Sequence, residues 1–557
     1  MKNIKRLSIG ERILSIATRI RPGEGKVTYV LILNAYLILF SHYLLKVIRE
    51  TLILSNGTAL DKSLANAITA LIITFIVSVY GWFYCKYKNR QDKDLLTLLV
   101  NGFFFVNIVL FMVGMVIGIE SPMIFYVWQG IYGILVVSHF WSFCADIMNK
   151  KSGQRLFPPI MVGASLGAWS GSYLADMVYS ISGVFSVMLT ALTCLALATF
   201  TSRYACRILP EHSRNHSVEI EDERKNYPVW EGFKLVFQKR YLLYTALFVL
   251  LMNWINSTGE FIFASYVKDE AIRLANSDLS LEQDSLISAY YSSYYTWVSV
   301  IGFVLQAVVV SRLLVWLGLK GSLYVLPIVM ILGYGLLALF PVFVIARMTM
   351  IMENSCSYSI ANTAKNILYL PLEREEKYVG KTTIDTFFWR LGDLLQYLVI
   401  AISINYFAWG SIHFIWLNLL LSVIMFFVAY MLMKNYRLST AGDVRGSAPI
   451  ASRGIPKLSI PPGITVRGVI GEDIFVDNDP GDAFRYFLLT PENIPFPRWI
   501  RFDPHHLTLD ITPPSNSEGE LSLILRVTDA DELSCEIDLH IKWFEGAILS
   551  EGLFEIS

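Results

Sequence analysis

The stretch Val27–Leu54, VTYVLILNAYLILFSHYLLKVIRETLIL, is apolar and longer than the roughly 20 residues that a helix needs to cross a bilayer. It nevertheless carries Lys46, Arg49 and Glu50, which the helical period places on one stripe. His42 lies one turn earlier on the same stripe. Each charge facing lipid at the bilayer centre would cost roughly 2.5–3.5 kcal/mol. The stripe is therefore predicted to face protein or a wet cavity, where paired cations suit an anionic solute; the alternative is a buried ion pair that only fixes helix register.

Composition indicates a protein with several membrane spans. Hydrophobic residues make up 54% and charged residues 17% of the 557 residues, against about a quarter charged in soluble domains. The net charge of zero identifies no partner. The six cysteines lack C-x-x-C spacing, so neither a disulfide framework nor a metal site is expected. The basic segment 1–26 lacks the apolar core of a secretory leader and is expected to form an amphipathic helix on the membrane surface.

Apolar segments continue along the chain, and we expect an all-α polytopic membrane protein with twelve transmembrane helices in two six-helix halves. The halves are residues 27–206 and 240–437, separated by a central cytoplasmic loop, 207–239. This organisation is typical of the major facilitator folds. Basic residues gather in the loops after the second and fourth spans, which predicts that both termini are cytoplasmic. The expected spans are 27–54, 64–86, 94–118, 122–147, 158–181, 183–206, 240–267, 285–311, 321–340, 341–369, 382–406 and 411–434.

The last part of the chain changes character. Residues 438–457 are rich in Ser, Gly, Ala and Pro and are expected to be a flexible linker. Residues 458–545 show short alternating strands, which predict an antiparallel β-sandwich, followed by a tail, 546–557. The expected strands are Thr465–Val476, Arg485–Leu489, Leu507–Ile511, Leu521–Asp529 and Cys535–Trp543.

Acidic turns in this part could hold calcium, but such residues also simply make turns, and we favour the turn interpretation. The residues concerned are Asp477, Asn478, Asp479, Asp482, Asp529 and Asp531.

Two later spans carry polar residues that could line a solute site. Span seven holds a polar break that includes Asn256 and Glu260, and transporter folds place their sites at such breaks. A local hydrogen-bonded kink is the alternative. In span ten, Glu353 and Asn354 are candidates for lining a cavity. Tyr294 in span eight belongs either to an interfacial aromatic belt or to a platform that stacks a base.

Span eleven adds Lys381, Asp385 and Arg390, of which Arg390 could instead pair with Asp393. The run Gly380-Lys381-Thr382 resembles the end of a phosphate-binding loop, but Glu375 stands where the first glycine belongs and no strand precedes it. ATP hydrolysis is therefore not supported, and no enzyme activity, cofactor or nucleic-acid partner is expected. Transport would run on exchange or on an ion gradient.

Span five carries a glycine at every fourth position, Gly163, Gly167 and Gly171. This spacing predicts a groove along which a neighbouring helix packs closely.

Residues of about 27–437 resemble the ATP/ADP translocase family, the nucleotide transporters of plastids and intracellular bacteria. The segments that carry the resemblance are Leu45-Lys-Val-Ile-Arg-Glu-Thr-Leu52, Phe140-Trp-Ser-Phe-Cys-Ala-Asp146, Gly153-Gln-Arg-Leu-Phe-Pro-Pro159, Leu370-Pro-Leu372 and Gly380-Lys-Thr-Thr-Ile-Asp385. The resemblance implies a nucleotide-binding ATP/ADP antiporter of the major facilitator type in a bacterial inner membrane.

The resemblance also implies roles for single residues. Arg49 falls where the family has a span-one lysine implicated in nucleotide transport, and Lys46 where it has an arginine. Glu260 and Lys381 resemble the family's span-seven glutamate and late lysine. Gln129 stands where the exchange carriers have a glutamate, so this chain is more similar to a divergent bacterial branch.

The C-terminal segments Pro497-Arg-Trp-Ile-Arg-Phe-Asp503 and Leu507-Thr-Leu-Asp-Ile-Thr-Pro-Pro514 resemble the cadherin-like putative immunoglobulin repeat. Such a module could bind a protein partner.

Three functions follow from the sequence. The first is a secondary transporter of an anionic solute such as ATP or ADP, working by alternating access. The second keeps the fold and carries an amino acid, a peptide or a drug-like molecule. The third is a membrane sensor or scaffold that does not transport and uses the C-terminal β-domain.

Overall fold

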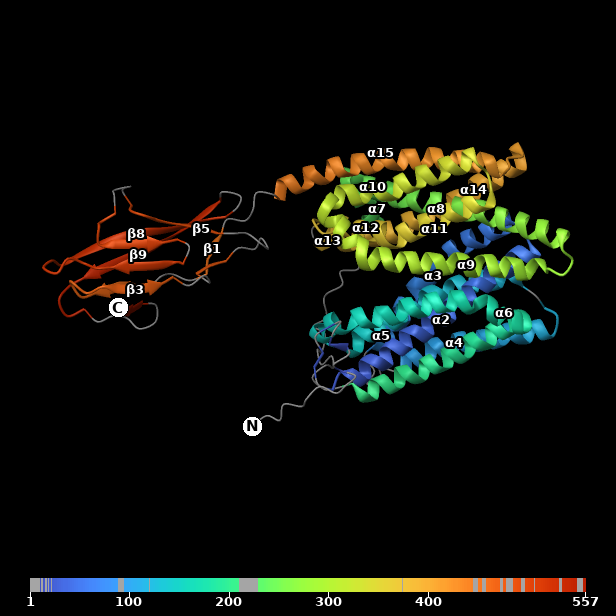
Figure 1. Cartoon of the computed structure of the whole chain (residues 1–557), viewed down its shortest axis with the longest axis horizontal. Coiled ribbons are helices and arrows are strands. Elements are labelled where there is room, and N and C mark those ends of the chain that lie inside the picture. The colour runs from blue at the N-terminus through green and yellow to red at the C-terminus, as the bar shows by residue number, and fades with distance from the viewer. Residues whose placement is uncertain are drawn as a thin grey trace. The chain divides into compact units, whose positions relative to one another are not determined.

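The computed structural model (Figure 1) divides the chain into two compact units, Met1–Tyr436 and Arg437–Ser557. The first unit is helical and the second is built from strands. The structure describes residues 11, 14–15, 18, 20–21, 23–88, 95–119, 121–209, 229–372, 374–443, 449–452, 457–470, 474–476, 484–491, 496–504, 506–529, 533–547 and 554–556. Most of the basic segment 1–26 and the centre of the loop 207–239 therefore lie outside the described residues.

Long apolar helices form the first half of the helical unit. The last of them is broken at Ser182 and Gly183, where Gly183 takes a left-handed φ of 61° that glycine adopts without strain. This break is the predicted turn between spans five and six. The helices are α2 (Gly25–Asn56), α3 (Ala59–Lys88), α4 (Leu95–Val116), α5 (Pro122–Ile147) and α6 (Lys150–Ile208).

A short helix, α7 (Val229–Gln238), lies in the central loop just before the second half. Three π-helical turns, η2, η3 and η4, interrupt the long helices that follow, and Gly318 breaks α10 with a φ of 64°. The elements are α8 (Arg240–Ser277), α9 (Gln283–Val304), η2 (Leu305–Val309), α10 (Val310–Leu339), α11 (Phe343–Cys356), η3 (Ser357–Ala361), α12 (Asn362–Leu368), α13 (Arg374–Thr383), η4 (Ile384–Phe388), α14 (Trp389–Phe407) and α15 (Ser411–Asp443).

Among the described residues, nine helices are long and apolar enough to cross a membrane. Two of these, residues 155–208 and 283–339, contain the breaks at Gly183 and Gly318 and so each hold two predicted spans. The all-helical membrane fold is confirmed, while the number of twelve crossings stays a prediction.

Close packing of α2 against α6 uses the predicted glycine groove. A side chain at Gly163 would meet the backbone oxygen of Ile32 at 2.5 Å, and one at Gly171 would meet that of Phe40 at 2.6 Å. Gly167 lies equally close to the backbone of Tyr36. The groove therefore holds α2, the helix with the charged stripe, at a fixed position in the first half.

The second unit pairs its strands into two four-stranded sheets and a two-stranded ribbon. One sheet has the order β10-β3-β7-β6, the other the order β2-β9-β8-β5, and β1 pairs with β4. Their inward faces form a separate core that includes Ile460, Leu509, Ile511 and Leu525. The strands are β1 (Ile450–Ala451), β2 (Leu458–Ile460), β3 (Val466–Val469), β4 (Phe475–Val476), β5 (Arg485–Leu489), β6 (Ile500–Asp503), β7 (Thr508–Ile511), β8 (Gly519–Thr528), β9 (Ser534–Trp543) and β10 (Phe554–Ile556).

This unit differs from the prediction in three respects. The predicted antiparallel sandwich contains one parallel pair, because β2 runs alongside β9 in the same direction. The predicted strand Thr465–Val476 is two strands, β3 and β4, in different sheets. Helix α15 continues to Asp443 and β1 lies at Ile450–Ala451, so part of the predicted linker has regular structure.

The acidic turn 477–483 and Asp531 lie outside the described residues. Asp529 is buried, and its carboxylate accepts a hydrogen bond from the backbone N–H of Leu533 at 2.9 Å, as the turn interpretation predicts.

Candidate functional site

A cavity of about 500 Å³ lies between the two halves of the helical unit. The first half lines it with α2, α3 and α5, and the second half with α8, α9, η3 and α14. This volume falls within the roughly 300–1,000 Å³ of small-molecule sites. Of the predicted site residues, those that line the cavity are Lys46, Arg49, Asn256, Glu260 and Arg390.

Lys46 and Arg49 present their cationic groups to the cavity among tyrosine rings. The Lys46 Nζ lies 4.2 Å from the ring centre of Tyr295 and 5.3 Å from that of Tyr43. Within the described part of the chain it forms no ion pair. The Arg49 guanidinium lies 4.4 Å from the ring centre of Tyr126. These cation–π contacts hold both side chains without neutralising them.

Lys62 at the start of α3 joins the two halves through buried ion pairs. Its Nζ lies 3.0 Å from an oxygen of Glu50 in the first half and 2.9 Å from an oxygen of Glu260 in the second. Glu50 is fully buried, and it also pairs with Arg49 at 3.0 Å. Two carboxylates thus share Lys62, and opening this end of the cavity would separate charges that are almost dry.

The second half supplies carboxylates and amides. Glu260 accepts a hydrogen bond from the Tyr294 hydroxyl at 3.0 Å. Asp393 accepts one from Ser257 at 2.5 Å and lies 3.7 Å from Arg390. The pairing of Arg390 with Asp393 that the sequence allowed is therefore present, and it leaves little free positive charge on this wall.

Other predicted site residues lie directly behind the lining. Gln129 accepts a hydrogen bond from Arg49 at 2.9 Å. Glu50 accepts a hydrogen bond from the hydroxyl of Tyr295 at 3.1 Å. A polar network beside Glu260 is formed by Tyr294, Glu353 and Asn354. These residues can position the lining groups without contacting a solute.

Lys381 and Asp385 lie apart from the cavity. Lys381 donates a hydrogen bond to Asn366 at 3.1 Å, and Asp385 pairs with Lys365 at 3.0 Å. The structure thus separates these two residues from the group around Lys46.

Lys62 was not among the site residues predicted from the sequence. Asp61 and Lys62 stand just before a long apolar segment, where lysines commonly anchor a helix at the membrane surface. Its bonding to Glu50 and Glu260 depends on helices that are far apart in sequence, so no local signal distinguishes it.

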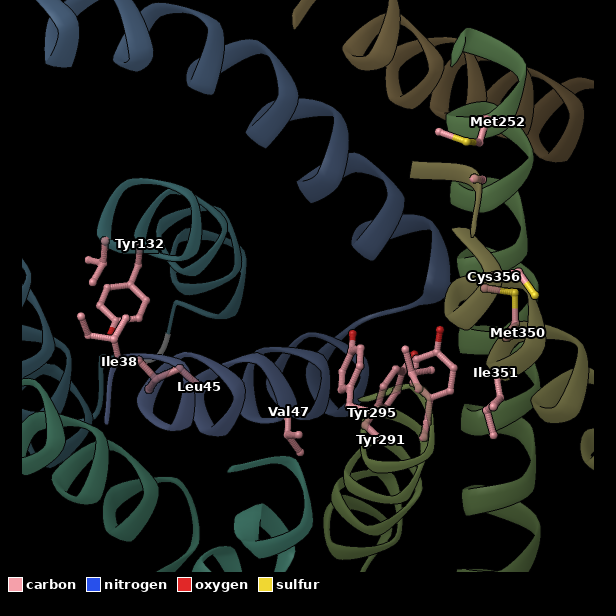
Figure 2. Close-up of a cluster of buried hydrophobic side chains, with 14 of the residues drawn as sticks. Ile38, Leu45, Val47, Tyr132, Met252, Tyr291, Tyr295, Met350, Ile351 and Cys356 are labelled. Carbon is pink, nitrogen blue, oxygen red and sulfur yellow. The ribbon is translucent and has the colours of Figure 1, made fainter. Parts of the chain in front are cut away.

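Aromatic packing between the halves surrounds this cluster. Figure 2 shows Tyr291 and Tyr295 of α9 between Val47 of α2 on one side and Met350 and Ile351 of α11 on the other. The Tyr291 hydroxyl accepts a hydrogen bond from Lys62 at 3.2 Å. Helix α9 is therefore the contact across which the halves meet beside the ion pairs.

Solved structures show which fold the helical unit has. The fold matches that of nucleoside transporter NupG with a TM-score of 0.51 and 11% identity, covering 74% of this chain and 99% of that one. It matches the POT family transporter PepTSo with a TM-score of 0.53 and 11% identity, covering 74% and 98%. At these identities the likeness shows the fold alone: the helical unit has the fold of major-facilitator-type membrane transporters.

The sequence comparisons find similarity to one family of transporters. The family model described as "TLC ATP/ADP transporter" matches residues 317–439. The chain is 22% identical over 385 residues to ADP,ATP carrier protein 1 of Chlamydia muridarum, covering 60% of this chain and 71% of the relative. It is 21% identical over 306 residues to the protein of the same name from Chlamydia trachomatis, covering 48% of this chain and 56% of that relative's length. The predicted resemblance to the ATP/ADP translocase family is confirmed.

Proposed function

We propose that this protein is a secondary transporter of an anionic nucleotide, of the ATP or ADP type. The observation that carries the proposal is the cationic wall of the cavity. Lys46 faces the cavity among the described residues without a counter-ion, one turn from Arg49. Arg49 uses two of its five N–H donors on Glu50 and Gln129, which leaves donors for a phosphate. The matched family and the carrier names of the relatives support the same cargo.

Tyrosine rings beside these cations suit the rest of a nucleotide. Tyr43, Tyr126, Tyr295 and Tyr358 line the cavity. Stacking of a base on an aromatic ring contributes about 1–3 kcal/mol where it has been measured. A cargo with a phosphate at Lys46 and Arg49 would have its base within this group of rings.

We propose that the cavity in this conformation opens toward the cytoplasm. Polar contacts between the halves gather at the end of α2 near Asn56, where Gln396 donates to Ser63 at 3.0 Å and Lys268 donates to the backbone oxygen of Gly57. The positive-inside pattern places the end of the helical unit near Asn56 on the outer side of the membrane. Both termini would then be cytoplasmic, and the membrane would be a bacterial inner membrane. Alternating access then requires the Lys62 ion pairs to break while the opposite end closes.

We propose the domain boundaries 1–26, 27–206, 207–239, 240–437, 438–457, 458–545 and 546–557. The β unit would be a cadherin-like module that binds a protein partner. No catalytic step is part of this function.

Reconstitution into vesicles loaded with ATP, ADP or buffer tests the proposal, with labelled nucleotide added outside. Uptake that depends on internal nucleotide would support exchange. Unlabelled nucleotides should compete for uptake, whereas amino acids and peptides should not. If only amino acids or peptides compete for uptake, the protein transports one of these solutes and not a nucleotide.

Arg49→Ala should abolish this uptake while the protein still inserts. Lys320→Ala serves as the matched control, because Lys320 is exposed at the start of a span and away from the cavity. Normal uptake by the Arg49 variant would remove Arg49 from the mechanism.

A further inference from the structure

Glu353 on α11 is a fully buried acid with neutral partners. The Tyr334 hydroxyl lies 2.5 Å from one carboxyl oxygen, and the Asn256 amide donates to the other at 3.2 Å. Within the described residues Glu353 takes part in no ion pair. The transport function proposed above does not use it.

Burial without a cation decides the protonation of this group. An ionised carboxylate moved into a dry interior loses several kcal/mol of hydration that neutral donors do not restore. Glu50 and Glu260 escape this cost because both lie within 3.0 Å of Lys62. These neutral surroundings therefore favour the protonated form of Glu353 over the ionised one.

The neighbouring groups accommodate a protonated carboxyl. Tyr334 can accept the carboxyl hydrogen while its own hydroxyl points toward the sulfur of Met350, 3.6 Å away. The charged or titratable groups that face Glu353 are Tyr334 from α10, Glu260 from α8, Tyr294 from α9, and Cys356 and Tyr358 from α11 and η3. None of these is a cation.

Asn256 connects Glu353 to the cavity. It lines the cavity, and its amide donates to Glu353 and, at 3.1 Å, to Asn354. Asn354 in turn donates to the Tyr294 hydroxyl at 2.6 Å, and Tyr294 donates to Glu260. A proton on Glu353 is thus one side chain away from cavity water and linked by hydrogen bonds to the carboxylate that holds Lys62.

We propose that Glu353 is a proton-binding site that couples transport to proton movement. The carboxyl O–H bond breaks when a movement of Asn256 admits cavity water, and the proton passes to that water. The new negative charge then lies in the network of Glu260 and attracts Lys62 away from Glu50. Loss of the proton therefore strengthens the attraction between Lys62 and the second half, and protonation weakens the ion pair of Lys62 with Glu260. The π-helical turn η3, which begins four residues after Glu353 and borders the cavity, gives α11 a place to deform.

Infrared spectroscopy of the purified full chain tests the proton site without any cargo. Titration between about pH 5 and 9 should show the C=O stretch of a protonated carboxyl group that disappears in Glu353→Gln. Glu282→Gln is the matched control, since Glu282 is exposed on the loop before α9, and it should keep the signal. A spectrum unchanged by Glu353→Gln would overturn the proposal. Glu353→Asp, which keeps the acid, should retain the signal if Gln prevents folding.

The coupling itself rests on the proposed function and needs vesicles. With a gradient of one pH unit, labelled ATP or ADP should accumulate up to about tenfold per proton carried. Glu353→Gln should lose this accumulation and the accompanying internal pH change, yet still exchange labelled for unlabelled nucleotide. Gradient-driven accumulation at the wild-type level in Glu353→Gln would contradict the coupling. Absence of any nucleotide uptake, with the infrared signal intact, would reject the nucleotide as cargo and leave the proton site standing.

Discussion

The two halves of the helical unit face one cavity with opposite charge. The first half contributes the cations Lys46, Arg49 and Lys62, whereas the second half contributes the carboxylates Glu260 and Asp393. The arginine on the second wall is held by its own carboxylate neighbour. The positive field of the cavity therefore belongs to the first half alone.

This difference explains how cargo and conformation can be linked. The ion pair between Lys62 and Glu260 crosses from one wall to the other, so it exists only while the halves meet at that end. The anionic cargo proposed above would compete with Glu260 for the cations of the first wall. The same charges can therefore bind the cargo and hold the halves together, and each variant below tests one part of this contrast.

Removal of Lys62 should have the largest effect. Lys62→Met leaves Glu50 and Glu260 without their shared cation, and the loss of one partner from a buried pair costs about 3–5 kcal/mol. Thermal unfolding of the purified protein, followed by size-exclusion chromatography, should show a clearly lower midpoint. Lys320→Met is the matched control. A midpoint equal to the wild type would mean that the ion pairs do not tie the walls together.

Disturbing the position of the cationic wall should have the next largest effect. Gly167→Leu forces a side chain against the backbone of Tyr36, and overpacking costs typically about 1–3 kcal/mol. The thermal midpoint should fall, and nucleotide uptake with it. Gly102→Leu on α4 is the control, because no atom lies within 4 Å of a side chain added there. Equal behaviour of the two variants would show that α2 does not depend on the glycine groove.

Making the second wall more positive should strengthen binding. Asp393→Asn removes the carboxylate that holds Arg390, which frees this cation for the cargo. One additional close charge contributes about 1 kcal/mol in water-like surroundings, so the Kd for labelled ADP should fall roughly fivefold. Binding measurements at low and high salt check this, since the gain should shrink as salt screens the charges. Weaker binding in this variant would show that Asp393 itself contacts the cargo.

The exposed ion pairs of the β unit should matter least. The Arg467 guanidinium beside Asp510 lowers the pKa of that carboxyl, and both side chains reach solvent. Because the folded pKa lies below the unfolded one, the pair stabilises the sheet above about pH 4 and loses its effect as the pH falls through the folded pKa. Hydrogen exchange of β3 and β7 peptides, corrected for intrinsic rates, should show a slightly smaller pH dependence in Asp510→Asn. If Asp510→Asn destabilised the protein as much as Lys62→Met does, exposed and buried ion pairs would contribute equally to stability, contrary to this account.

The sequence predicted which face of a helix a residue lies on better than it predicted how far that residue is from the cavity. The period of α2 predicted that Lys46 and Arg49 face protein or a wet cavity, because a charge facing lipid is costly, and both residues line the cavity in the structure. The same reasoning expected Glu353 to line the cavity, yet it lies behind Asn256, since periodicity says nothing of distance from the axis of the bundle. The spacing of turn residues likewise predicted a β unit but not the parallel pairing of β2 with β9.

The roles of some site residues could not be predicted because they depend on partners far away in the sequence. Lys62 gains its importance from Glu260, which lies in the other half. Lys381 was grouped with the site by resemblance and Asp385 as a further charge of span eleven, whereas the structure gives them the local partners Asn366 and Lys365.

Direct binding of labelled ADP to purified Lys46→Ala tests the central claim, because Lys46 is the cation of the first wall that has no counter-ion among the described residues. The affinity should fall at least about tenfold, the equivalent of 1.4 kcal/mol, while Lys320→Ala binds like the wild type. Unchanged affinity in Lys46→Ala would contradict the assignment of the first half as the anion-binding wall.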